Sequence, residues 1–395
     1  MSIEVLHIVG VSFPSYSGYT IRTENILNSI NDKNIHITVA CSIFSRRKDQ
    51  MKLGKYFVHN NREYYQLLSP VILRAMNIIA KIPKVRALLK YCYVLLNAFL
   101  LQSRVNINNY DVIHGHSTFI NGLSALLLAR IHRKIFIYDI HALGIDAYNK
   151  KSIKYKLEKL LEGFIINRSD KIIVIDYKLK EHIQSIFNVD NKNVFVAPNG
   201  IDSSFFRKRK KDANLLHNYN IPLDKYLVGV DNSKPIEGFN FIYKNQKKIK
   251  KLIDNIHFIV FGNKENNLPQ QNFTFLPNIE YRNMPVLYSV VDLFIIPRPK
   301  NAQTDTVTPL KLLELMSCEI PVIVSDVGGL TSCIKDNKTG FILKENDISS
   351  LIKIISYVQN KNISKITLNA KDWVKKNKSW EFAGQQYINC YNQLI

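Results

Sequence analysis

Cysteine is scarce in this sequence, and none of it is arranged for pairing or metal binding. Only five cysteines occur in 395 residues. None stands at the spacing of a metal site or a redox pair, which suits a reducing cytosol, and no metal is expected. The chain enters an apolar run at residues 3–9 without a basic leader or a cleavage site. We therefore expect no secretory signal and a cytoplasmic protein.

Long hydrophobic runs are missing too. The longest, residues 91–101, is interrupted by Asn97 and is too short to span a bilayer. Apolar residues make up 46% of the chain, which is typical of a globular protein. A chain of 395 residues is long enough for two domains of ordinary size, each with its own core.

Acidic residues are few: 54 Lys and Arg stand against 32 Asp and Glu, a net charge of +22. Such an excess fits nucleic acid, anionic lipid or anionic small substrates, or consists of dispersed, solvated lysines. The basic stretches at 207–211 and 244–251 are predicted to be an exposed linker and an exposed helix face. No zinc finger, RNP-like aromatic pattern or helix-turn-helix accompanies them, so nucleic acid is not expected as a partner.

Residues 64–110 contain no acidic residue at all. Their basic residues stand among many apolar ones: Arg74, Lys81, Lys84, Arg86, Lys90 and Arg104. A basic, apolar helix pair suits the interface of an anionic membrane, which would place the protein peripherally on the inner face of the cell membrane. The alternative is that these are ordinary helices packing on a sheet.

Strand-like apolar runs alternate with helical patterns along the whole chain, which predicts parallel α/β domains. The first half has runs at 5–9, 35–40, 112–114, 135–138, 172–175 and 194–197, and the second at 226–230, 256–261, 273–275, 293–296, 322–324 and 341–343. Proline, glycine, asparagine and basic residues accumulate between Asn199 and Leu223. We therefore predict domains at 1–205 and 206–375, followed by a helical segment at 376–395.

Residues 305–329 are the most informative stretch. Thr308 is a suitable N-cap and Pro309 a suitable first helical residue, so a helix is expected to start there. Glu314 falls among leucines, one turn after Lys311. A carboxylate held among leucines near a helix N-terminus is a candidate ligand-binding group.

The segment from Glu314 to Val322 resembles the donor-binding motif of retaining glycosyltransferases of family 4. That motif is a Glu, seven residues, a second Glu, and then Ala-Met-Ala-x-Gly-x-Pro-Val. The resemblance implies that Glu314 hydrogen-bonds the ribose hydroxyls of a nucleotide sugar. Thr306 stands where the first Glu is usual, which is a departure from the pattern. The sequence from Val307 to Lys311 resembles that of a subgroup associated with bacterial exopolysaccharide synthesis.

The resemblance also implies a GT-B fold, in which two Rossmann-like doubly wound domains face a central cleft. The final helix, 376–395, would cross back to the first domain. In open α/β sheets, ligands bind at the carboxyl ends of the strands. The cleft would then hold the donor and the acceptor.

Two candidates follow the first strand. Gly18 allows a close backbone approach where a helix opens, and helix N–H groups favour an anion. The Ser-Gly-Tyr-x-x-Arg-Thr motif again resembles the exopolysaccharide subgroup, so Gly18 is expected to contact a donor or acceptor phosphate. Arg22, one turn later, is either a charge in the cleft or a solvated surface arginine.

Further candidates end later strands of the first half. By the resemblance, His116, the second residue of a His-x-His pair, would hydrogen-bond the transferred sugar; otherwise it is a structural histidine. Asp139 and His141 end the next strand, where the subgroup tends to have Glu and Arg. Asn199 belongs to a Pro-Asn-Gly turn that we interpret as structural, with its side chain a candidate for lining the site.

The residues that bind the diphosphate of the nucleotide sugar in this family are not found at their usual positions. The family places an Arg after the first strand of the second domain and a Lys further on; here no Arg follows that strand, and Glu237 occupies the Lys position. A buried charge without a partner costs several kcal/mol, so other cations must compensate. We expect Lys311 and Arg298 to form the phosphate clamp, with Lys234 as a third candidate. Gly328 and Gly329 are expected to add backbone N–H contacts.

The resemblance implies transfer of a sugar from a nucleotide diphosphate sugar to a saccharide or lipid-linked acceptor, with retention and without a cofactor. Retaining hydrolases use two carboxylates, and no such pair is apparent. In the family, the departing phosphate is thought to accept the proton of the acceptor. Two alternatives stay open: another GT-B nucleotide-sugar enzyme such as an epimerase, and a non-catalytic sugar-nucleotide-binding subunit.

Overall fold

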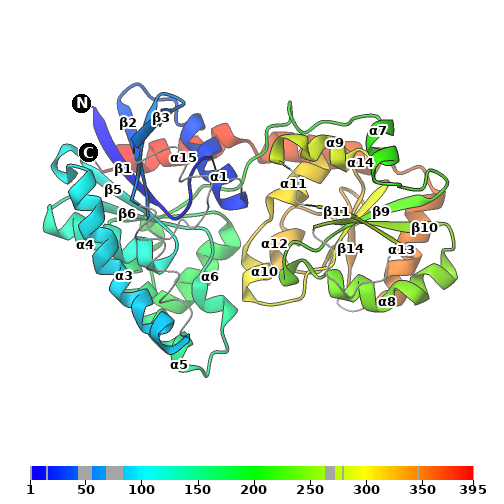
Figure 1. Cartoon of the computed structure of the whole chain (residues 1–395), viewed down its shortest axis with the longest axis horizontal. Coiled ribbons are helices and arrows are strands. Elements are labelled where there is room, and N and C mark those ends of the chain that lie inside the picture. The colour runs from blue at the N-terminus through cyan, green and yellow to red at the C-terminus, as the bar shows by residue number, and fades with distance from the viewer. Residues whose placement is uncertain are drawn as a thin grey trace. The chain divides into compact units, whose positions relative to one another are not determined.

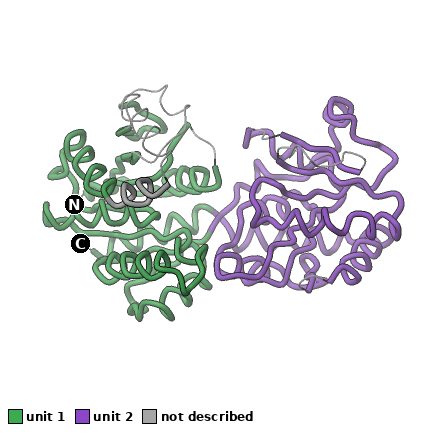
Figure 2. Tube along the Cα trace, turned by 60° about the horizontal axis from the view of Figure 1, so that its bottom comes forward, with its two compact units in different colours: residues 1–198, 380–395 green, residues 199–379 purple. Residues whose placement is uncertain are grey.

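The computed structural model describes residues 2–14, 17–42, 56–67, 83–262, 272–277, 280–344 and 347–394, with side chains from residue 92 onward in the segment that begins at 83. The chain divides into two compact units (Figure 2). Unit 1 comprises Met1–Pro198 and Trp380–Ile395, and unit 2 comprises Asn199–Ser379. The last helix, α15 (Trp380–Asn392), thus belongs to the same unit as the N-terminus.

Unit 1 contains an eight-stranded sheet in the order β3-β4-β2-β1-β5-β6-β7-β8. All neighbouring strands are parallel except β3 and β4, which form an antiparallel hairpin at the edge. The strands are β1 (Ile3–Val9), β2 (Ile35–Cys41), β3 (Tyr56–His59), β4 (Arg62–Gln66), β5 (Val112–His116), β6 (Ile135–Ile140), β7 (Lys171–Val174) and β8 (Val194–Val196).

Helices cover this sheet (Figure 1). They are α1 (Gly18–Ser29), α3 (Pro83–Arg104), α4 (Phe119–Ile131), α5 (Ile153–Ile166), α6 (Tyr177–Phe187) and α15. Helix α4 packs against both α3 and α5, and α15 packs against α1. Gly384 allows this last contact, because a Cβ there would lie 2.5 Å from the carbonyl oxygen of Ser29.

Unit 2 contains a six-stranded parallel sheet in the order β11-β10-β9-β12-β13-β14. The strands are β9 (Tyr226–Asp231), β10 (Ile256–Phe261), β11 (Phe273–Leu276), β12 (Leu293–Ile296), β13 (Val322–Ser325) and β14 (Phe341–Leu343). The helices are α7 (Ala213–Asn218), α8 (Phe239–Leu252), α9 (Met284–Tyr288), α10 (Ala302–Thr306), α11 (Leu310–Ser317), α12 (Gly328–Thr331), α13 (Ile348–Asn360) and α14 (Ser364–Asn377).

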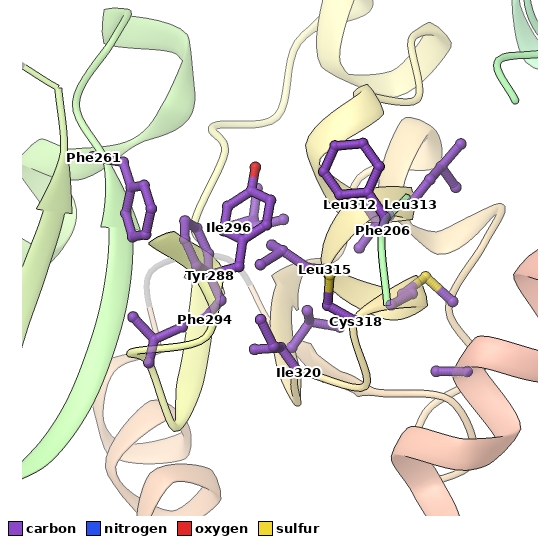
Figure 3. Packing of buried hydrophobic residues seen from close by; sticks show 14 of the residues in the cluster. Phe206, Phe261, Tyr288, Phe294, Ile296, Leu312, Leu313, Leu315, Cys318 and Ile320 are labelled. Atoms are coloured by element: carbon purple, nitrogen blue, oxygen red, sulfur yellow. The ribbon is translucent and has the colours of Figure 1, made fainter. Parts of the chain in front are cut away.

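Alternate residues of the unit 2 strands enter different cores, because successive side chains of a strand point to opposite faces. Phe294 and Ile296 join one cluster, whereas Leu293 and Ile295 join the other. Figure 3 shows the first cluster, in which the leucines of α11 gather with aromatic residues from β12 and α9. This packing fixes the position of α11, the helix that carries Lys311 and Glu314.

The prediction of two parallel α/β sheets is confirmed, and every predicted strand is present. The β3–β4 hairpin was missed, and its second strand overlaps the start of the segment predicted to be a helix pair. Most basic residues of that segment lie outside the described side chains. One helix boundary was wrong: α11 begins at Leu310, with Pro309 rather than Thr308 at the N-cap position.

The part of the chain that the structure describes contains no helix that is both long and apolar enough to cross a membrane.

Candidate functional site

Unit 1 gathers polar side chains where β5 and β6 end. His116 and Asp139 are register partners at the carboxyl ends of these parallel strands, so their side chains meet. His116 Nδ1 lies 3.2 Å from Asp139 Oδ2, and His141 Nε2 lies 3.2 Å from the same oxygen. His116 and Asp139 are both buried. The structure thus brings together three of the predicted site residues.

Helix α15 completes this group from the far end of the chain. The hydroxyl of Tyr387 donates to Asp139 Oδ2. The hydroxyl of Tyr391 lies 3.0 Å from His7 Nε2 and 2.9 Å from His114 Nδ1. His7 Nδ1 in turn lies 2.8 Å from His116 Nε2.

These contacts are consistent with one set of neutral tautomers. If His116 Nδ1–H donates to Asp139, His116 Nε2 must accept from His7 Nδ1–H. His7 Nε2 then accepts from the Tyr391 hydroxyl, whose oxygen accepts from His114 Nδ1–H. A hydrogen-bonded chain therefore runs from His114 to Asp139, and it fixes the orientation of the His116 ring.

Burial decides the charges in this group. It lowers the pKa values of His7 and His114 well below their usual value, and neighbouring histidines add to the effect. Burial also lowers the pKa of His141, although Asp139 opposes the shift. For Asp139, burial favours the neutral form, but His141 and His116 outweigh it and hold the pKa well below its usual range. Asp139 is therefore a carboxylate in a group where burial favours the neutral forms of His7, His114 and His141.

The same residues include two sets that could hold a metal ion: His7, His114 and His116, and His116, Asp139 and His141. Sequence spacing did not reveal them, because their members come from three different strands and a loop. Both ring nitrogens of His116 already have hydrogen-bond partners within the protein.

Arg22 and Gly18 occupy different environments on α1. Arg22 is buried, and its Nη2 donates to the carbonyl oxygen of Ala197 at 2.8 Å. It is therefore not a solvated surface arginine. Gly18 is exposed at the first position of α1, after the N-cap Ser17, whose hydroxyl accepts from the N–H of Thr20.

In unit 2, Lys311 and Glu314 lie one turn apart on α11. Lys311 Nζ forms an ion pair with Asp231, the last residue of β9. Glu314 is buried, and its Oε2 accepts a hydrogen bond of 2.7 Å from the Tyr288 hydroxyl. Glu314 is therefore not a surface residue of an amphipathic helix.

Both groups titrate away from their usual values. Burial lowers the pKa of Lys311 to about 8, against an opposing effect of Glu314. Burial raises the pKa of Glu314, and Tyr288 and Lys311 limit the rise. A half-buried lysine beside the carboxyl end of a parallel strand can bind an anionic ligand where open α/β sheets usually bind ligands.

Arg298, which follows β12, pairs with Glu237. Arg298 Nε and Nη2 donate to the two carboxylate oxygens of Glu237 at 3.0 and 2.7 Å, and both residues are buried. Gly238 makes this turn possible: its φ is +80°, and a Cβ there would lie 1.8 Å from the carbonyl oxygen of Pro297. The Glu at the usual Lys position is thus compensated by Arg298. Lys234, the third predicted cation, is exposed.

Thr306 and Asn199 make contacts within unit 2. The Thr306 hydroxyl, which stands where the family has a Glu, donates to the carbonyl oxygen of Ala302 at 2.8 Å inside α10. Asn199 Nδ2 donates to the carbonyl oxygen of Thr308 at 2.8 Å, just before α11. Asn199 therefore helps to position the start of that helix.

Gly328 and Gly329 permit close packing of α12 against the α10 region. A Cβ on Gly328 would lie 2.4 Å from the carbonyl oxygen of Asp305, and one on Gly329 would lie 2.3 Å from that of Val307. The N–H of Gly328 donates to Asp305 Oδ1 at 2.8 Å. This N–H group, predicted to contact the donor, thus already has an acceptor.

Several residues of these groups were not predicted: His7, Tyr387, Tyr391, Asp231 and Tyr288. The two tyrosines of α15 carry a signal in their spacing of four residues. His7 sits inside an apolar strand and carries none.

Two family models match the chain. The model described as Glycosyltransferase Family 4 matches residues 17–205, and the model described as Glycosyl transferases group 1 matches residues 218–380.

Curated relatives align over most of the chain. An Escherichia coli UDP-Gal:alpha-D-GlcNAc-diphosphoundecaprenol alpha-1,3-galactosyltransferase is 25% identical over 65% of this chain and 68% of its own length. A capsular polysaccharide biosynthesis glycosyltransferase of Staphylococcus aureus, CapM, is 25% identical over 69% of this chain and 74% of its own. An uncharacterized glycosyltransferase of Methanocaldococcus jannaschii, MJ1178, is 24% identical over 97% of both chains.

Solved structures show the same architecture. Sucrose-phosphate synthase from Thermosynechococcus elongatus superposes with a TM-score of 0.74 at 17% identity, covering 99% of both chains. Anabaena HepE, solved in complex with UDP, gives 0.70 at 15% identity over 100% of both chains. At such identities the likeness concerns the fold.

Proposed function

Because the chain belongs to the family 4 glycosyltransferases, matched over both halves, and has the GT-B fold, we propose that it transfers a sugar with retention at the anomeric carbon. The donor would be a nucleotide diphosphate sugar and the acceptor a saccharide or lipid-linked hydroxyl. HepE has been solved with UDP-glucose, which supports this class of donor. The names of the E. coli and S. aureus relatives support a role in bacterial surface polysaccharide or glycolipid synthesis.

The observation that carries this proposal is the placement of Lys311 and Glu314 on α11, beside the carboxyl end of β9. Glu314 would accept hydrogen bonds from the ribose hydroxyls. Lys311 would bind the diphosphate in exchange for its ion pair with Asp231. Arg298 would contribute less to the phosphate clamp, because Glu237 already neutralises its charge.

Unit 1 would act on the transferred sugar. His116 would hydrogen-bond a sugar hydroxyl in exchange for one of its two present partners, Asp139 or His7. The leaving diphosphate would accept the proton of the acceptor. The protein would then orient the reactants and stabilise the charge on the leaving group. This reaction requires no cofactor.

Replacing Lys311 tests the donor site. A hydrogen bond to a charged group contributes roughly 1.5–3 kcal/mol, so Lys311→Ala should raise the donor KM by about 10- to 100-fold. Lys353→Ala, which replaces an exposed lysine of helix α13 in the same unit, is the matched control and should change it little. An unchanged donor KM in Lys311→Ala would contradict the clamp.

The pairing of Arg298 with Glu237 favours a second candidate, a non-catalytic sugar-nucleotide binder, because it neutralises one of the expected phosphate-binding cations. Release of nucleoside diphosphate that depends on an acceptor would identify the transferase. Binding without release would identify the binder. A screen of nucleotide sugars for thermal protection would supply the donor, since a ligand at 100 times its Kd stabilises by about 2.7 kcal/mol.

The segment 64–110 would hold the protein at the inner face of the cell membrane. The exposed Leu95 and Phe99 of α3, in the described part of this segment, support this role.

A further inference from the structure

Helix α5 buries its acidic residues and exposes four of its large apolar ones. Glu158 and Glu162 are each only 2% exposed, whereas Ile153 is 84% and Leu160 is 71% exposed. Leu157 and Phe164 are also exposed. This is the reverse of an ordinary helix on a sheet, which turns its apolar stripe toward the core.

The orientation of α5 is fixed by its buried side. The Tyr138 hydroxyl, from β6, donates to Glu162 Oε2 at 2.9 Å, and Ile165 and Ile166 are buried beside it. A rotation that buried Leu160 would pull Glu162 away from this partner. The outward stripe is therefore a consequence of the fold and not of a loosely attached helix.

The exposed apolar residues form one continuous stripe, which we call the α5 stripe: Ile153, Leu157, Leu160 and Phe164. Their spacing of four, three and four residues places them on one side of the helix. Soluble monomers rarely leave an apolar stripe of this kind uncovered, and such patches mark sites of interaction.

Positive charge surrounds the α5 stripe. Lys150, Lys151, Lys154, Lys156 and Arg168 are exposed around it. Between residues 147 and 169 the only acidic residues are Glu158 and Glu162, and both are buried. The guanidinium of Arg168 lies 3.9 Å from the centre of the Phe164 ring, so charge and apolar surface adjoin directly.

A second helix adds apolar surface. Both α3 and α5 pack against α4, and Figure 1 shows them beside it. The strands that they connect run parallel in the order β4, β2, β1, β5, β6 and β7, so right-handed crossovers place α3, α4 and α5 on one face of the sheet. On that layer α3 exposes Leu95 by 66% and Phe99 by 69%.

We propose that the α5 stripe is a docking surface for an anionic lipid membrane, into whose interface Ile153, Leu157, Leu160 and Phe164 insert. The neighbouring lysines would lie at the level of the headgroups, as in other interfacial amphipathic helices. A second copy of the chain fits this surface poorly, because it would bring two basic rims together. The proposal adds a surface that lies outside the segment 64–110.

Vesicle binding tests the proposal on the full chain, without donor or acceptor, so that its failure leaves the proposed transfer reaction untouched. Vesicles of equal parts phosphatidylglycerol and phosphatidylcholine should bind the protein, and vesicles of phosphatidylcholine alone should bind it much less. The double variant Ile153→Gln, Leu160→Gln should bind at least about tenfold more weakly, since two large apolar side chains no longer leave water.

A matched control comes from unit 2, where Leu223 is 79% and Leu252 is 61% exposed. The variant Leu223→Gln, Leu252→Gln makes the same chemical change and should bind like the parent. Lys151→Gln with Lys154→Gln should weaken binding and flatten its dependence on salt.

Equal binding by the α5 variant and the control variant would overturn the proposal, as would equal binding to neutral and anionic vesicles. Absence of vesicle binding, together with self-association or capture of an acidic protein that the α5 variant abolishes, would also overturn it and assign the stripe to a protein partner. Thermal unfolding of both variants should match that of the parent, because all four replaced side chains are exposed.

Discussion

The polar groups of unit 1 and unit 2 are buried in different ways. In unit 1, one carboxylate, Asp139, shares a buried hydrogen-bonded group with His7 and His114, whose pKa values burial lowers, and tyrosines complete the hydrogen bonds. In unit 2, full charges pair with each other, as in Arg298 with Glu237 and Lys311 with Asp231. The first arrangement is vulnerable to acid, which charges the rings. The second is vulnerable to loss of one partner and to alkali, which discharges the lysine.

The largest effect should come from breaking a pair in unit 2. Glu237→Gln leaves the buried guanidinium of Arg298 without its counter-charge, so the free energy of unfolding should fall by about 3–5 kcal/mol. Urea denaturation of the full chain measures the loss. The exposed pair Arg282–Glu280 is the control, and Glu280→Gln should cost less than about 1 kcal/mol.

A double variant shows whether the loss of stability comes from the unpaired charge and not from another effect of replacing Glu237. Glu237→Gln with Arg298→Met removes both charges and should recover most of the lost stability. If Glu237→Gln and Glu280→Gln lowered the free energy of unfolding equally and by little, unit 2 would not depend on its buried charge pair, and the contrast with unit 1 would not hold.

The next effect concerns acid and unit 1. The folded pKa values of His7 and His114 lie well below their usual 6.5, so below pH 6.5 the unfolded chain binds protons that the folded chain does not. Stability is therefore complete above that pH and falls as the pH drops, by at most about 2 kcal/mol per histidine at pH 5, the limit set by an unfolded pKa of 6.5. Asp139, whose pKa is held low, stays ionised in this window and contributes no loss. Urea denaturation at pH 7 and pH 5 measures the difference.

Variants isolate the contribution of unit 1 from that of His257 in unit 2, whose pKa burial lowers to about 4. His7→Gln should reduce the loss of stability between pH 7 and pH 5. His36→Gln, at an exposed position, should leave the loss unchanged. An identical pH dependence in His7→Gln and the parent protein would refute the acid sensitivity assigned to unit 1.

The smallest effect concerns alkali and unit 2. Burial lowers the pKa of Lys311 to about 8, so above this pH the lysine loses the charge that would bind the diphosphate. The donor kcat/KM should then fall, approaching about tenfold per pH unit well above pH 8, as expected for loss of one proton. In Lys311→Arg the fall should disappear, because a guanidinium stays charged. A fall that persists unchanged in this variant would point to another group.

How far the sequence predicts the fold depends on the strand. Strands such as β9 and β12 are buried on both faces, so they read as apolar runs, and they were predicted. Strand β3 alternates between exposed and half-buried residues at the sheet edge and was missed. In its turn, Asn60 and Asn61 both have positive φ. Asparagine favours this conformation, so the Asn-Asn pair in the sequence could have revealed a tight hairpin.

The candidate site was predictable in part for a similar reason. Glu314 and Lys311 stand out because charges among leucines need an explanation; Glu314 is buried and Lys311 is half-buried. His7 and Asp231 do not stand out, since a polar residue within or at the end of an apolar strand is locally unremarkable. Their roles appear only when parallel strands bring them beside residues from elsewhere.

The sequence by itself determined the alternation of strands and helices, the two α/β sheets, and the position of Glu314 on a buried helix, because these depend on local periodicity. Tertiary structure alone decided which polar groups pair. Asp139 meets Tyr387, and Arg298 meets Glu237, although neither pair is close in the chain. Such partners are set by the order of strands in a sheet and by the helices that pack on it, and no local pattern of residues encodes that order.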